Sequence, residues 1–298
     1  METFELVASE ALTMEAVAPL SEMYTLSPFV WRKAKGWEVL LRAVPRRDDM
    51  PVLKIARIYY GRSQDGLHFV MDKEPALAPG PRPEDLDGCE DPTVAIDNGT
   101  HSVYYSGWNE QTKQGVLLLA TGPDGAHLEK QGVRLASTPQ QANPKEATIV
   151  RARDGSWRLF YEFAADDASQ IGLASAPTVD GPWTVQEPLF GARRGQWDDW
   201  HLSTGPLLLN DPQRPVMFYN GATQDAKWRI GWVMFDADYT QVIARSQEPL
   251  IVPPPPVPPA TDIAFAASAV EQGEQIYLYY SVADQEMLRA TLRRASGE

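Results

Sequence analysis

Residues 93–105 read TVAIDNGTHSVYY, a stretch with the pattern of a β-hairpin. The apolar run Thr93–Ile96 leads into the turn signal Asp97-Asn98-Gly99, and a second run closes on Val103-Tyr104-Tyr105. A turn signal between two short runs rich in β-branched and aromatic residues predicts two antiparallel strands. Gly115–Thr121 adds a third strand-like run, and the apolar residues show almost no helical period.

This pattern recurs about every 60 residues, a period typical of repeat arrays and propeller blades. The closing aromatic runs of the later copies are Leu159-Phe160-Tyr161, Met217-Phe218-Tyr219 and Leu278-Tyr279-Tyr280. An earlier copy consists of Phe29–Trp31, Trp37–Arg42, Ile55–Gly61 and Asp65–Phe69. Five four-stranded units therefore fit between Tyr24 and Arg293.

Five such units predict an all-β protein with the architecture of a five-bladed β-propeller, in which radial repetition leaves only short edges unpaired. The prediction treats residues 1–298 as a single domain, with an irregular β-sandwich as the alternative. The last unit is one strand short, so we expect the alternating segment Phe4–Thr13 to close the ring. Because proline donates no ladder hydrogen bond, Pro253–Pro259 is expected to be a stiff loop between blades rather than an SH3-type ligand.

The composition limits the partners of the protein. The chain has 27 Lys+Arg and 40 Asp+Glu, a formal net charge of −13, which argues against nucleic acid and anionic membranes because Lys and Arg bind both. A single cysteine, Cys89, excludes a disulfide framework and a Cys-ligated zinc site. Without an apolar run of membrane length or a signal-peptide pattern, we expect a cytoplasmic protein. We predict no metal and no cofactor, and a homo-oligomer is compatible with the sequence.

Acidic residues recur where the innermost strand of each predicted blade begins. They lie in Glu90-Asp91, Lys145-Glu146, Asp198–His201 and Asp262. The innermost strands of a propeller line its central channel, so these side chains are expected to converge on one pocket. Converging carboxylates are what glycoside cleavage requires, since one protonates the leaving oxygen and another activates the attacking group.

Tryptophans accompany these acidic positions. Trp31 and Trp108 are predicted to stack on sugar rings, and Trp197, Trp200 and Trp228 lie near the same strand starts. The sequence therefore predicts an oligosaccharide substrate.

The string Asp87–Thr93, which reads DGCEDPT, resembles the Gly-x-Glu-Asp-Pro-Arg signature of glycoside hydrolase family 130. That family comprises β-mannoside phosphorylases and β-1,2-mannosidases on five-bladed propellers. Further matches to the family are Arg62–Gly66, Lys145, Met217–Gly221 and Leu278–Asp284. The resemblance covers roughly residues 24–292 and rests on the order and spacing of these motifs.

The resemblance implies an inverting enzyme in which Asp91 is the general acid. Three positions depart from the family pattern, because Thr93, Glu162 and Asn220 stand where the phosphorylases have arginine or histidine residues that bind phosphate. Losing cationic groups and gaining a carboxylate disfavours a phosphate dianion. We therefore predict an inverting glycoside hydrolase that acts on β-mannosides, with Glu162 or Glu146 as the base.

Other functions stay open at this point. They are a mannoside phosphorylase, another propeller glycosidase of the arabinofuranosidase or fructosidase kind, and a carbohydrate-binding propeller without catalysis. The predicted substrate-binding residues are Glu90, Lys145, Asp199, His201, Asn220, Asp262, Trp31 and Trp108. The basic cluster Arg42, Arg46 and Arg47 is interpreted as a solvated turn.

Overall fold

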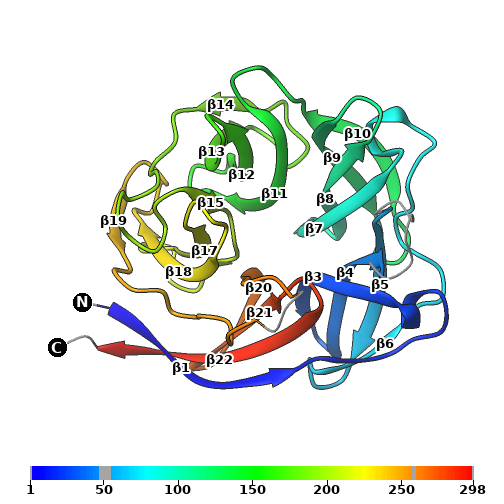
Figure 1. The fold of residues 1–298 in the computed structure, drawn as a ribbon, viewed down its shortest axis with the longest axis horizontal. Helices are drawn as coiled ribbons and strands as arrows, with labels where there is room; N and C mark the ends of the chain where they lie inside the picture. Colours follow the sequence, from blue (N-terminus) through cyan, green and yellow to red (C-terminus); the bar gives the residue numbers. More distant parts are fainter. Residues whose placement is uncertain (1, 47–54, 257–259, 297–298) are drawn as a thin grey trace.

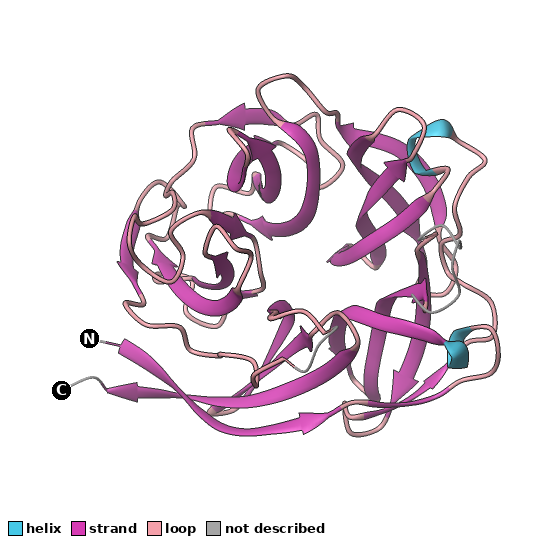
Figure 2. Ribbon diagram, in the orientation of Figure 1, coloured by secondary structure: helices cyan, strands magenta, loops and turns pink. Residues whose placement is uncertain are grey.

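The computed structural model describes residues 2–46, 55–256 and 260–296, and it shows five β-sheets arranged as a ring around a central axis (Figure 1). The prediction of an all-β, five-bladed propeller is confirmed. Regular structure in the described ranges consists of strands and two short 3-10 helices, Leu20–Glu22 and Pro83–Asp85 (Figure 2). None of the helices in these ranges has the length and apolar character needed to cross a membrane.

Each blade begins at the axis and proceeds outward. Blade 1 contains β3 (Met23–Lys33), β4 (Gly36–Pro45), β5 (Arg57–Ser63) and β6 (His68–Met71). Blade 2 contains β7 (Gly88–Asp97), β8 (Thr100–Asn109), β9 (Gln114–Gly122) and β10 (Glu129–Leu135). Blade 3 contains β11 (Ala142–Arg151), β12 (Trp157–Ala165), β13 (Ala168–Ala176) and β14 (Thr184–Gln186).

The last two blades follow the same order. Blade 4 contains β15 (His201–Ser203), β16 (Leu207–Leu208), β17 (Val216–Ala222), β18 (Trp228–Phe235) and β19 (Val242–Arg245). Blade 5 contains β20 (Ala264–Gln272), β21 (Gln275–Val282), β22 (Glu286–Ser296) and, at its outer edge, β1 (Glu2–Ala11). The proline run begins in the loop from β19 to β20, and residues 257–259 of that run lie outside the described residues.

The first and last strands of the chain pair with each other. β1 runs antiparallel to β22 from Glu2 opposite Ser296 to Ala11 opposite Leu288, in the place where the sequence left room for a strand. The chain then continues into β2 (Thr13–Glu15), which pairs in parallel with β6 on blade 1 (Figure 1). The N-terminal segment therefore bridges the outer edges of two neighbouring blades.

The repeated aromatic runs form the packing between blades. Tyr104, Tyr161, Tyr219 and Tyr279 lie on the second strands of four blades and are fully buried. A buried phenol needs a hydrogen-bond partner, and each of these hydroxyls has one. The Tyr104 hydroxyl crosses from blade 2 to donate to the Val179 carbonyl. The rings of the four tyrosines pack in core clusters that join adjacent blades, so the repeat seen in the sequence is the repeat of this packing.

Candidate active site

Three innermost strands carry the same backbone irregularity near their first residues. The pairing of β3 with β4, of β7 with β8 and of β11 with β12 shifts register at this point. Ser27, Asp91 and Glu146 lie within these shifts and have φ values of 50°, 49° and 51°. Residues other than glycine rarely adopt this left-handed backbone, and a bulge re-aims a side chain out of the alternation of its strand. All three residues line one pocket.

This central pocket has a volume of about 180 Å³ and receives residues from all five blades. Besides the three bulge residues, its walls include Arg42, Lys145, Glu162, Trp228, Phe265 and Asp284. Because every blade contributes, the complete ring is needed to form it.

Asp91 is held by two donors from blade 1. The Ser27 hydroxyl donates a hydrogen bond of 2.9 Å to Asp91 Oδ1, and Arg42 Nη1 lies 3.2 Å from the same oxygen. The other nitrogen, Arg42 Nη2, lies 2.7 Å from Glu90 Oε1. One guanidinium thus joins two adjacent carboxylates and fixes the orientation of Asp91 in the pocket.

The interpretation of Arg42 as part of a solvated turn is wrong. Its side chain is 18% exposed, because β4 places it beside the innermost strand and against Glu90 and Asp91. Burial opposes its charge, but the carboxylates of Glu90, Asp91 and Glu146 outweigh that effect and raise the pKa of Arg42. Arg46 instead lies over the ring of Tyr24, and Arg47 lies outside the described residues.

Glu146 differs from Asp91 in its surroundings. Its backbone N–H donates to the Ser106 hydroxyl, whereas its carboxyl group has no hydrogen-bond or ion-pair partner among the described residues. Burial raises the pKa of Glu146 well above its ordinary value, and the carboxylates of Asp91 and Glu162 add to this effect. The pocket therefore favours a protonated Glu146 next to carboxylates with cationic partners.

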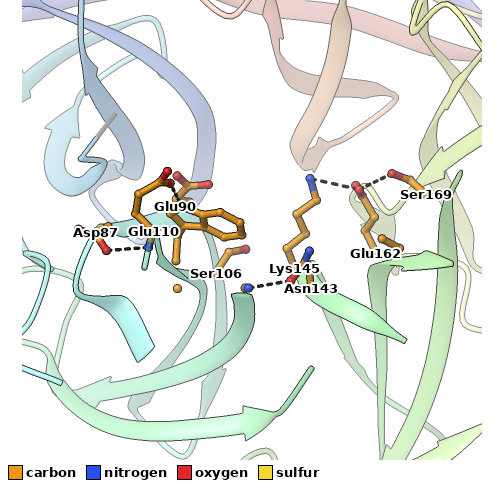
Figure 3. Close-up of a pocket in the computed structure, with 12 residues that line it drawn as sticks. Asp87, Glu90, Ser106, Glu110, Asn143, Lys145, Glu162 and Ser169 are labelled. Carbon is orange, nitrogen blue, oxygen red and sulfur yellow. Dashed lines mark hydrogen bonds and ion pairs between the residues drawn. The ribbon is translucent and has the colours of Figure 1, made fainter. Parts of the chain in front are cut away.

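Glu162 and Lys145 face each other across the first two strands of blade 3, where their backbones are directly paired. Lys145 Nζ lies 3.2 Å from Glu162 Oε1, and the Ser169 hydroxyl donates to the same oxygen at 2.7 Å (Figure 3). Glu162 is almost completely buried, and its negative charge raises the pKa of Lys145. Lys145 thus carries its positive charge at the edge of the pocket.

A larger pocket of about 550 Å³, here called the outer pocket, adjoins the central one and shares Lys145 and Glu162 with it. Figure 3 shows its polar walls, to which Glu90, Glu110 and Asn143 contribute. Asn143 is fixed by the Gly115 N–H, which donates to its side-chain oxygen at 2.8 Å. Fixed polar groups around a concave site are typical of a small-molecule binding pocket.

The structure brings together six of the predicted residues. Asp91, Glu146, Glu162, Lys145, Glu90 and Trp108 all line the central or the outer pocket. His201 is one step removed from them: its Nδ1 accepts a hydrogen bond of 3.1 Å from the Ser169 N–H, and its ring stacks on Trp228 at 5.7 Å. Burial lowers the pKa of His201, which favours the neutral ring that can accept this hydrogen bond.

Two other predicted residues line neither the central nor the outer pocket, and their side chains contact other parts of the fold instead. Trp31 is 8% exposed and packs against Tyr60 and His101 between blades 1 and 2, so its ring is not available to a sugar. Asn220 is fully buried, where it accepts from the Ala266 N–H at 2.7 Å and donates to the Thr204 carbonyl at 2.6 Å.

The two remaining predictions involve carboxylates of blades 4 and 5. Asp262 forms an ion pair of 2.8 Å with Arg229. Asp199 is half-buried, and neither residue lines the central or the outer pocket. Its neighbour Asp198 is fully buried and pairs with Arg193 and Arg245, so this acidic run stabilises blade 4 instead of facing the pockets.

Several residues of the site escaped prediction as site residues, among them Ser27, Arg42, Asn143 and Ser169. Ser27 had a usable signal, because it occupies in the first repeat the place that Asp91 occupies in the second. Ser169 had none, since its role depends on the pairing of the hairpin between β12 and β13. No group of three or more His, Cys, Asp or Glu side chains in the described part of the chain is arranged to hold a metal ion.

With this geometry established, comparison with known proteins assigns the family. The model of glycoside hydrolase family 130, described as β-1,4-mannooligosaccharide phosphorylase, matches residues 46–293. The chain belongs to glycoside hydrolase family 130. The resemblance noted in the sequence is thereby confirmed, and the match includes Asp91, Lys145, Glu146 and Glu162.

Two curated proteins resemble this family 130 chain over most of its length. The β-1,2-mannobiose phosphorylase of Listeria innocua is 27% identical over 243 residues, which cover 78% of this chain and 65% of that protein. A protein of the same name from Thermoanaerobacter sp. strain X514 is 22% identical over 247 residues, covering 80% of this chain and 78% of that one.

Solved structures agree with the fold of this family 130 chain. The Listeria innocua phosphorylase in complex with β-1,2-mannobiose superposes with a TM-score of 0.79 at 20% identity, covering 96% of this chain and 91% of that one. A second solved structure has a TM-score of 0.75 at 22% identity. It is described as coming from the glycoside hydrolases of the family that target β-1,2-mannosidic linkages in Candida mannan. It covers 90% of this chain and 84% of that one.

Proposed function

We propose that this protein cleaves β-mannosidic linkages in oligosaccharides at the central and outer pockets. The observation that carries the proposal is the convergence of Asp91, Glu146 and Glu162 on the central pocket, with Lys145 and Glu162 shared by both. The proposal of mannose as the sugar rests on membership of a family of β-mannoside-cleaving enzymes. A binding propeller without catalysis needs no such set of buried carboxyl groups.

Asp91 is the proposed general acid. It lies on a bulge that directs it into the pocket, and Ser27 and Arg42 fix its position. Glu146 is the carboxyl group of the pair whose neutral form is favoured, since its pKa is raised, and a neutral carboxyl group can donate a hydrogen bond to a sugar hydroxyl. Two carboxyl groups in different surroundings can thus fill different roles in one reaction.

Phosphate is the first candidate for the attacking group. The family model is described as a phosphorylase, and the Listeria innocua and Thermoanaerobacter relatives described above are named as phosphorylases. Lys145, which lines both pockets and whose side chain is 46% exposed, is the cationic group available to meet the anion. This reaction releases a sugar 1-phosphate.

Water is the second candidate, favoured by the charges of the pockets. Arg42 already pairs with Glu90 and Asp91, and Lys145 pairs with Glu162. A phosphate dianion would have to compete with these carboxylates for both cations. In hydrolysis Glu162 would be the base that activates water, because the raised pKa of Glu146 disfavours its ionised form.

The test incubates β-1,2- and β-1,4-linked mannobiose with the protein, with and without inorganic phosphate, and identifies the products. We expect cleavage in wild type and a loss of about 10²–10⁴-fold in kcat for Asp91→Asn, the usual contribution of general acid catalysis. Asp97→Asn, at the far end of the same strand, is the matched control. Mannose 1-phosphate supports the first candidate, and free mannose independent of phosphate supports the second. Absence of cleavage, or an active Asp91→Asn variant, would contradict the proposal.

A further inference from the structure

We propose that a third pocket, between blades 3 and 4, binds one additional sugar unit of the oligosaccharide. This blade 3–4 pocket has a volume of about 280 Å³, and its walls include Asp166, Ser169, Gln170, Phe190 and Trp200. The inference rests on the proposed function, because the occupant is a further unit of the same substrate.

The three pockets form a continuous series. The central pocket shares Lys145 and Glu162 with the outer pocket, and the outer pocket shares Ser169 with the blade 3–4 pocket. Ser169 is also the residue whose hydroxyl holds Glu162. A linear oligosaccharide that occupies the first two pockets therefore meets the third at a side chain already in the site.

All three pockets open on one face of the ring. The central and outer pockets lie where β11 begins and β12 ends, and the blade 3–4 pocket lies at the turn from β12 to β13 and at the start of β15. In antiparallel strands of one blade these ends lie on the same side. An extended substrate can thus follow the face from the axis outward.

Trp200 is an aromatic surface held in a fixed position. Its indole Nε1 donates to the Asp167 carbonyl at 3.1 Å, and its backbone N–H donates to the Ala222 carbonyl at 3.1 Å. The indole hydrogen bond lies in the plane of the ring and does not cover its faces. No other ring of the described residues stacks on Trp200. A half-buried aromatic with a satisfied polar end is suited to contact the apolar face of a sugar.

Polar side chains complete the blade 3–4 pocket. Asp166 and Gln170 line the same pocket as Trp200 and supply the acceptors and donors that sugar hydroxyls need. Asp166 and Asp167 have φ values of 51° and 59°, so this turn has a defined left-handed conformation. An apolar surface with a few polar groups placed by fixed backbone is the composition expected of a saccharide site.

The test compares β-linked mannotriose with mannobiose in two measurements. The first is KM in the active protein, and the second is equilibrium binding to the Asp91→Asn variant. We expect wild type to favour mannotriose about tenfold in both, and Trp200→Ala to abolish that preference while leaving mannobiose unchanged, since one well-packed aromatic contact contributes about this much. Trp200→Phe should restore part of the preference. Val185→Ala, exposed on the outer edge of blade 3, is the control.

Three outcomes would overturn the inference. The first is the absence of any preference for mannotriose in wild type, and the second is an unchanged preference in Trp200→Ala. The third is an equal loss of affinity for mannotriose and mannobiose in that variant, which would indicate a structural role for Trp200. The binding measurement separates this inference from the proposed function. If no β-mannoside is cleaved but mannotriose binds in a manner that depends on Trp200, the third sugar site stands and the catalytic proposal fails.

Discussion

Glu162 is the residue at which the two candidate reactions differ most. Its carboxylate forms an ion pair with Lys145 and accepts a hydrogen bond from the Ser169 hydroxyl. If phosphate attacks, Glu162→Gln removes a competing negative charge, and the KM for phosphate should fall. If water attacks, the same variant loses its base, and kcat should fall by about 10²–10⁴-fold whatever the phosphate concentration.

Steady-state kinetics at several phosphate concentrations measures both effects in one series. Glu187→Gln, an exposed change in the loop that follows β14, is the control. If Glu162→Gln leaves both the phosphate KM and kcat unchanged, the carboxylate only positions Lys145.

Glu146 gives a prediction about stability and pH. Its pKa in the folded protein lies above the ordinary value of 4.5. At pH values between 4.5 and the higher pKa of the folded protein, Glu146 has lost its proton in the unfolded chain but still holds it in the folded protein. The free energy of unfolding therefore falls as pH rises through this range. Glu146→Gln removes this dependence on pH and should be more stable than wild type at pH 7. The expected gain is about 1.4 kcal/mol for each unit by which folding raises the pKa of Glu146.

Urea unfolding at pH 4 and pH 7 checks this prediction. At pH 4 the two proteins should be close in stability, because Glu146 is then mostly neutral in both states. Glu129→Gln, on the exposed outer strand of blade 2, should show no comparable gain at pH 7. A Glu146→Gln variant that is less stable than wild type at pH 7 would show that the carboxylate is stabilised by the fold.

At the scale of elements, Asn220 joins β17 of blade 4 to β20 of blade 5. It accepts a hydrogen bond from the Ala266 N–H and donates to the carbonyls of Thr204 and Ala266. Asn220→Ala leaves a buried N–H without its acceptor and should cost about 1–3 kcal/mol of stability. We expect KM for the sugar to stay the same below the unfolding temperature. A higher KM at unchanged stability would instead indicate contact with the substrate.

At the scale of the whole molecule, Phe4 tests how the ring closes. It lies on β1 of blade 5, and its ring meets Phe218 at 5.1 Å and Trp232 at 5.7 Å on blade 4. Phe4→Ala should reduce the free energy of unfolding by about 3–5 kcal/mol. Val7→Ala, at a position 55% exposed on the same strand, should have little effect. Equal unfolding midpoints in urea for the two variants would mean that this strand does not hold the ring together.

The fold could be predicted from the sequence because it repeats. Blades 2 to 5 each place an aromatic pair on the second strand, and repetition turns a weak strand signal into a strong one. The carboxylates of the site were predictable for the same reason, since Asp91 and Glu146 occupy equivalent bulges.

The rest of the site depends on contacts between segments far apart in the chain. Arg42 is 49 positions from Asp91, and nothing in its local sequence of basic residues indicates a carboxylate partner. Asn220 shows the reverse case, in which a local motif predicts a site residue and the structure does not place it in the site. Its motif resembles a family site position, but its side chain forms hydrogen bonds with backbone groups of blades 4 and 5. Such pairings follow from the closed ring and not from any local pattern.

The pairing of β1 with β22 also has a consequence for synthesis of the protein. β1 is synthesised before its partner strand, which begins at Glu286, so at about 5–20 residues per second β1 waits roughly a quarter of a minute to a minute for that strand. An unpaired strand edge invites aggregation, and charged side chains protect against it. Glu5 and Glu10 pair with Arg293 and Arg289 in the closed ring, and we expect their unpaired negative charges to protect β1 from aggregation until those arginines are synthesised.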